Sequence, residues 1–143
     1  MGPENQKKIS SKEYSSVLKG LELKSLYFSG AKFALSKENI AIGSIVKIES
    51  RASFKVLENN SVEVAHSYRL RVINKENKKI GIRIRCDIIL LYSSKETFSE
   101  LFFEIFKGIN LPINTWPYFR EYVSSSISRM NVPPLVLPLF KRT

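Results

Sequence analysis

The sequence is poor in the residues that build covalent, metal-bound or phosphate-binding sites. It has one cysteine, Cys86, and one histidine, His66, so it forms no intrachain disulfide and offers no Cys/His cluster for a metal. Its 6 glycines are dispersed and form no glycine-rich phosphate loop. No serine or cysteine stands in a recognisable nucleophile setting. These absences predict that the chain is not an enzyme and has no cofactor and no metal.

Long apolar runs and acidic residues are also scarce. No window approaches 18 consecutive apolar residues, so the chain is not expected to insert into a membrane. The polar N-terminus without an apolar signal segment, together with the single cysteine, predicts a reducing, cytoplasmic location. Only 13 acidic side chains stand against 23 basic ones, a formal charge of +10. That imbalance predicts attraction to an anionic partner or an acidic client, although a basic surface that only aids solubility is the plainer alternative.

The 143 residues are enough for one domain with an ordinary core, since 43% of them are hydrophobic. Residues 1–16 are polar and lack periodicity, which predicts a flexible N-terminal arm. Residues 17–143 are expected to form the single domain.

Four segments predict an antiparallel sheet. Residues 45–57, 62–72 and 80–92 alternate apolar and polar side chains, and turn-forming residues separate them. The first strand, residues 18–35, places Leu26 and Phe28 opposite its other apolar side chains. The other apolar side chains of that strand are Leu21, Leu23, Tyr27, Ala31, Phe33 and Leu35. A strand that is apolar on both faces usually has both covered, so it is expected at a subunit interface.

The period changes after the sheet. Apolar residues from Phe98 to Ile109 recur at helical spacing, which predicts a short amphipathic helix with Ser93 and Glu96 at capping-box positions. A longer helix is expected from Asn110 or Asn114 onward, with Pro117 in its first turn.

The alternation also predicts what each face of the sheet carries. His66 and Cys86 fall on the inward face, where His66 is expected to be a core or interface residue and Cys86 a small buried residue. The outward positions of the last three strands form a basic platform, with Lys47, Arg51, Lys55, Arg69, Arg71, Arg83 and Arg85 against Glu49, Glu63 and Asp87. A basic nucleic-acid-binding domain is the alternative function, but none of these outward positions carries the aromatic side chain that base stacking needs.

The most specific pattern is an ordered series near the C-terminus. Pro117-Tyr118-Phe119-Arg120-Glu121 on the long helix is followed by Ser128-Arg129 and by Pro133-Pro134-Leu135-Val136-Leu137. This series resembles the C-terminal signature of the SecB family of protein-export chaperones. The resemblance implies an α+β fold with a four-stranded antiparallel sheet followed by a short and a long helix. It also implies a homotetramer, a dimer of dimers, that acts as an ATP-independent holdase and binds unfolded or partly folded client proteins in exposed hydrophobic grooves.

With this interpretation, three groups of site residues are expected. Client binding is expected of Phe28, Phe33, Ile40, Ile42, Leu137, Leu139 and Phe140. The oligomer interface is expected to hold Trp116, Tyr118, Phe119, Tyr122, Val123, Ser126 and Ile127. The basic face of Arg69, Arg71, Arg83 and Arg85 is expected to dock a partner.

Two features differ from the export-type members. Those proteins present acidic residues of the first strand to the SecA motor, where this sequence has Gly30, Lys32 and Ala34, and they continue past the final strand, whereas this sequence stops at Thr143. Docking to SecA is therefore not expected. The aromatic, Pro-Pro form of the signature is closer to the SecB-like chaperones of toxin-antitoxin-chaperone systems, whose client is an antitoxin. A dedicated antitoxin client and a general role in protein export both remain open.

Overall fold

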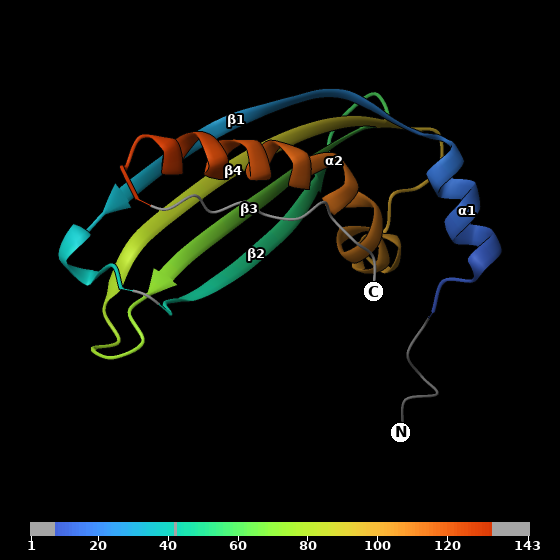
Figure 1. The fold of residues 1–143 in the computed structure, drawn as a ribbon. Helices are drawn as coiled ribbons and strands as arrows, with labels where there is room; N and C mark the ends of the chain where they lie inside the picture. Colours follow the sequence, from blue (N-terminus) through green and yellow to red (C-terminus); the bar gives the residue numbers. More distant parts are fainter. Residues whose placement is uncertain (1–7, 42, 133–143) are drawn as a thin grey trace.

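The computed structural model of the chain describes residues 8–41 and 43–132. Four antiparallel strands form one sheet in the order β1-β4-β3-β2, and the long helix α2 lies across one face of it (Figure 1). This arrangement confirms the predicted α+β class. The elements are α1 (Ser11–Lys19), β1 (Leu21–Leu35), the 3₁₀ turn η2 (Lys37–Asn39), β2 (Ile45–Val56), β3 (Ser61–Ile73), β4 (Ile80–Ser94) and α2 (Glu100–Ser128).

The two central strands carry the core. Every second side chain of β3 and β4 faces α2, and the opposite side chains are half-buried or exposed, as the alternation of the sequence predicted. On the helix-facing side the buried residues are Val62, Val64, His66, Tyr68, Leu70 and Val72 of β3, and Ile82, Ile84, Cys86, Ile88, Leu90 and Tyr92 of β4. The helix-facing side of the sheet is therefore its buried, apolar face.

β1 departs from strict alternation because it contains two register shifts, between Leu23 and Ser25 and between Phe28 and Gly30. Each shift moves the following side chains to the other face of the strand. Leu26 and Phe28 consequently pack against the core, and Tyr27 lies on the outward face, opposite Ile89 and 54% exposed. The expectation that β1 is apolar on both faces, with Tyr27 among the inward residues, is wrong.

α1 is a helix where a flexible arm was expected, so the expectation fails for residues 11–16. Ser10 caps it by accepting a hydrogen bond from the Glu13 amide, and the Ser10 hydroxyl donates to the Glu13 carboxylate. Val17 is buried and the ring of Tyr14 stacks on Phe102 at 4.8 Å. Tertiary packing therefore holds a helix that is too short to be stable alone.

α2 is one helix of 29 residues where two were expected. Ser99, rather than Ser93, is its N-cap and accepts from the Phe102 amide. Pro112 and Pro117 both lie inside the helix, which changes direction along its length in Figure 1. Proline removes one backbone hydrogen bond and bends a helix without ending it when packing compensates. Among the described helices, none is long and apolar enough to cross a membrane.

Aromatic side chains join the periphery to the start of α2. Phe54 of β2 packs against Phe98 and Phe103 with ring centroids 5.0 and 4.7 Å apart. Offset and edge-to-face aromatic pairs contribute about 0.5–1.5 kcal/mol each beyond their burial. This cluster therefore attaches the edge strand β2 to the helix near one end of the sheet.

Candidate functional site

α2 covers the two central strands but leaves apolar side chains of both edge strands exposed on the same face. One row across the sheet, set by the strand register, runs from Phe33 of β1 through Ile84 and Leu70 to Ile48 of β2. Ile84 and Leu70 are buried, whereas Phe33 and Ile48 are 40% and 38% exposed. The apolar face of the sheet is therefore wider than the helix that covers it.

The same distribution recurs along both edges. We refer to Leu23 and Phe33 as the β1 edge and to Val46, Ile48 and Val56 as the β2 edge, and each of these side chains is at least 38% exposed. Burying a valine or isoleucine side chain contributes about 1.5–3 kcal/mol in full, so each half-exposed one offers roughly 1 kcal/mol to a bound apolar segment. Of these residues, Val46 and Ile48 are neighbours on one face of the strand and form a candidate apolar contact for a bound segment.

The backbone of the edge strands adds directional contacts. Within the described residues, β1 pairs only with β4 and β2 pairs only with β3. The outer edge of each strand therefore presents amide and carbonyl groups that an extended peptide can join as a further strand. Main-chain hydrogen bonds give affinity in such a complex whatever the peptide sequence, and contacts with alternate side chains add specificity.

The predicted client-binding residues are only partly brought together. Phe33 lies on the β1 edge, but Phe28 and Ile40 are half-buried and pack against the core. The ring of Phe28 meets Tyr122 of α2 at 6.0 Å. Ile42, Leu137, Leu139 and Phe140 lie outside the described residues. The sequence did not indicate the β2 edge as a binding surface, because the alternation in this strand predicts that these side chains face the core. They are exposed only because α2 does not extend over them.

The predicted oligomer interface lies largely inside the protomer. Phe119, Val123, Ser126 and Ile127 are 0–3% exposed because α2 packs this stripe onto its own sheet. Trp116 and Tyr122 are half-buried, and Tyr118 is 50% exposed. Placement of those first four residues on a subunit surface is therefore wrong, and Tyr118 is the member of the group that remains well exposed.

A buried polar network lies beneath the middle of α2. The Thr115 hydroxyl donates to the Leu111 carbonyl at 3.2 Å, so it accepts from His66 Nδ1 at 2.9 Å and from the Tyr68 hydroxyl at 2.8 Å. Burial lowers the pKa of His66 to about 4 and raises the pKa of Tyr68 to about 12. All three side chains are at most 4% exposed, which makes this a structural network and confirms His66 as a core residue.

Cys86 is likewise a core residue. Burial, with the charges of Asp87 and Glu121, raises the pKa of its thiol to about 12. A fully buried thiol that stays protonated is neither a nucleophile nor a metal ligand. In the part of the chain that the structure describes, no three His, Cys, Asp or Glu residues come together as a metal site.

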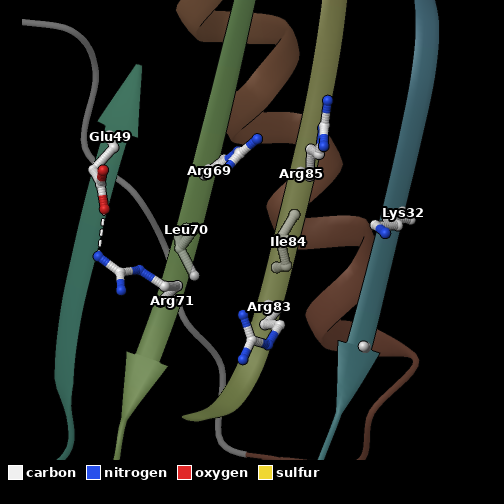
Figure 2. A pocket seen from close by; sticks show the side chains of 9 residues that line it. Lys32, Glu49, Arg69, Leu70, Arg71, Arg83, Ile84 and Arg85 are labelled. Atoms are coloured by element: carbon white, nitrogen blue, oxygen red, sulfur yellow. Dashed lines mark hydrogen bonds and ion pairs between the residues drawn. The ribbon is translucent and has the colours of Figure 1, made fainter. Parts of the chain in front are cut away.

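The outward face of the sheet has a different chemistry. Cationic side chains surround an open hollow of about 500 Å³ over β1, β4 and β3 (Figure 2). Arg71 forms an ion pair with Glu49, and Arg85 Nε lies 3.1 Å from Asp87. Burial raises the pKa of Asp87, but hydrogen bonds from Ser67 and Arg85 outweigh this effect, so the pKa lies below its usual value. The charged residues that line the hollow are Lys32, Glu49, Arg69, Arg71, Arg83 and Arg85.

The four-stranded antiparallel sheet followed by a long helix matches the fold of a solved SecB-like chaperone. The chain is similar to the SecB-like chaperone of Mycobacterium tuberculosis solved in complex with a ChAD peptide from the HigA1 antitoxin, with a TM-score of 0.75 and 18% sequence identity over 90% of this chain and 96% of that one. The resemblance predicted from the C-terminal series is thus confirmed at the level of fold.

The other comparisons add little. No protein-family model and no curated protein sequence matches the chain. A Streptococcus agalactiae protein of unknown function covers 82% of this chain and 96% of its own length with a TM-score of 0.43 and 9% identity, which is too distant to carry an argument.

Proposed function

We propose that this protein is an ATP-independent chaperone that holds an unfolded or partly folded client against the exposed apolar edges of its sheet. The observation that carries the proposal is the combination of a SecB-like fold with half-exposed apolar rows on both edge strands. A protein that binds the unfolded state removes it from aggregation in proportion to its affinity for that state. Shallow apolar contacts and strand pairing do this without a shape-selective pocket.

The client that we propose is an extended segment of an antitoxin. The support is the similar chaperone, which was solved with an antitoxin peptide. The β2 edge suits such a segment because Val46 and Ile48 stand two residues apart on one face. An added strand with apolar residues at every second position would place them against this row.

Replacing the three residues of the β2 edge by threonine is expected to abolish most of the protection from aggregation. Threonine keeps the β-branched shape that suits a strand but removes the apolar surface. Loss of roughly 1 kcal/mol per side chain predicts a weakening of client affinity by about a hundredfold. The measurement is light scattering, which follows the aggregation of a chemically unfolded reporter protein without nucleotide, at increasing ratios of chaperone to reporter.

The matched control is Ile45→Thr. Ile45 begins the same strand, is 40% exposed and faces the opposite side of the sheet. It should suppress aggregation as well as the unchanged protein does. Equal loss in both variants, or no suppression by the unchanged protein at stoichiometric amounts, would contradict the proposal.

We also propose that the chain assembles as a homotetramer, a dimer of dimers, through exposed residues of α2. Support comes from Ile113 and Tyr118, which are 55% and 50% exposed on this helix. Multi-angle light scattering should give about four times the chain mass of 16.4 kDa. Ile113→Ser with Tyr118→Ser should reduce the particle to a dimer, and a monomeric unchanged protein at micromolar concentration would rule the assembly out.

A further inference from the structure

The outward face of the sheet is divided into a cationic half and an apolar half. In the cationic half the register aligns Lys32, Arg85 and Arg69 in one row, and Arg83 and Arg71 in the next. Asp87 stands at the boundary, opposite Ser67 and Gly30. The four arginines stand on β3 and β4, the two central strands, which are paired on both sides, whereas Lys32 and Tyr27 stand on the edge strand β1.

The cationic half is electrostatically unbalanced. Arg69 lies directly opposite Arg85, and Arg71 directly opposite Arg83. Like charges at directly opposite positions of an antiparallel pair destabilise it. Figure 2 shows the guanidinium groups of Arg69 and Arg83 over the space between β3 and β4, whereas Arg71 turns toward Glu49. An external anion over this space would relieve the repulsion.

The apolar half begins one row beyond Asp87. Tyr27 lies opposite Ile89 and is 54% exposed. Leu91, two residues further along β4, is half-buried on the same face, where it lies opposite Ser25 and Glu63. Tyrosine and arginine are the side chains that most often dominate the affinity of protein–protein interfaces. The two halves together thus have the composition of a protein-binding surface.

We propose that the outward face binds an acidic segment of a partner protein, with its carboxylates over the four arginines and an apolar residue against Tyr27 and Ile89. Acidic residues at every second position of an extended segment are about 7 Å apart, which matches the spacing of Arg69 and Arg71 and of Arg83 and Arg85. Arginine binds carboxylates through two parallel hydrogen bonds. This surface is on the opposite side of the sheet from the β2 edge, so the protein would hold two polypeptides at once.

Two other occupants fit less well. A second copy of this chain would bring another strongly basic molecule, of formal charge +10, to a basic face. Nucleic acid would favour aromatic side chains among the cations, so that bases stack where phosphates are held. Asp87 separates Tyr27 from the arginines and would repel a phosphate backbone running between them. The acidic protein segment is the occupant that uses both halves.

The experiment measures binding of a fluorescent peptide of about ten residues, which spans Arg83 to Leu91 at ~3.3 Å per residue. In this probe, glutamates alternate with threonines in one half and leucines alternate with threonines in the other. Anisotropy titrations on the full chain should show micromolar binding that weakens between about 50 and about 300 mM NaCl. A peptide with glutamine for each glutamate should bind at least about tenfold more weakly.

Four variants decide where the peptide binds. Arg69→Gln with Arg85→Gln should weaken binding about tenfold, and Tyr27→Ser about fivefold. The matched control, Lys78→Gln with Lys79→Gln, removes the same charge from the exposed β3–β4 turn and should change the affinity less than about twofold. The β2-edge threonine variant should bind the peptide normally, which separates this proposal from the client site.

Several results would overturn the proposal. One is the absence of binding, and another is an equal loss in the lysine control, which would show attraction to bulk charge alone. A twelve-nucleotide oligo(dT) that binds more tightly than the peptide and needs the same arginines would instead make the face a nucleic-acid surface. The arginine variant should unfold at about the same temperature as the unchanged protein, because it relieves like-charge repulsion but also removes the exposed Arg85–Asp87 ion pair.

Discussion

Thr115→Val is expected to lower the free energy of unfolding by about 3 kcal/mol, because it leaves two buried donors without an acceptor. In the folded protein, His66 Nδ1 and the Tyr68 hydroxyl both donate to the Thr115 oxygen. Valine fills nearly the same volume, so the loss is one of hydrogen bonding and not of packing. Chemical denaturation followed by circular dichroism measures the change.

Thr97→Val is the matched control, since Thr97 is exposed in the loop before α2. It should change the free energy of unfolding by less than about 0.5 kcal/mol, as is usual for surface substitutions. A change at Thr115 of the same size as this control would show that the buried hydroxyl is not an obligatory acceptor.

Stability is expected to fall by about 3 kcal/mol as the pH decreases from 6.5 to 4, because His66 is buried neutral. Its pKa is lowered from 6.5 to about 4 by burial, so the unfolded chain binds the proton first. The contribution of neutral His66 to the free energy of unfolding is therefore complete above pH 6.5 and is lost as the pH falls from 6.5 to about 4. Denaturation curves at half-unit steps of pH would measure the slope, which should approach about 1.4 kcal/mol per unit.

His66→Gln should remove most of this slope while lowering stability at neutral pH, since glutamine does not titrate. Asp87 does not explain the loss of stability between pH 6.5 and 4. The pKa of Asp87 is lowered from 3.8, so its contribution to stability is lost only as the pH falls below about 3.8. An unchanged slope in the His66 variant would mean that another group carries the acid sensitivity.

The alternation of apolar and polar residues was enough to predict β3 and β4 and their inward residues, including His66 and Cys86. A central strand packed on one face has a period of two, which is a property of the chain itself. The ordered series beginning at Pro117 likewise indicated the fold that the structural comparison confirmed. These features are local, so the sequence alone carried them.

The remaining features depended on contacts between distant segments. The two bulges of β1 move Tyr27 outward because the register with β4 requires them, and no sequence period encodes that shift. α1 forms because Tyr14 and Val17 find partners in the folded protein, and α2 continues through Pro112 because packing on the sheet compensates the lost hydrogen bond. The β2 edge stays exposed because one helix is narrower than four strands. The sequence by itself determined the strands and the fold, whereas only the tertiary structure decided which apolar side chains are left for a partner.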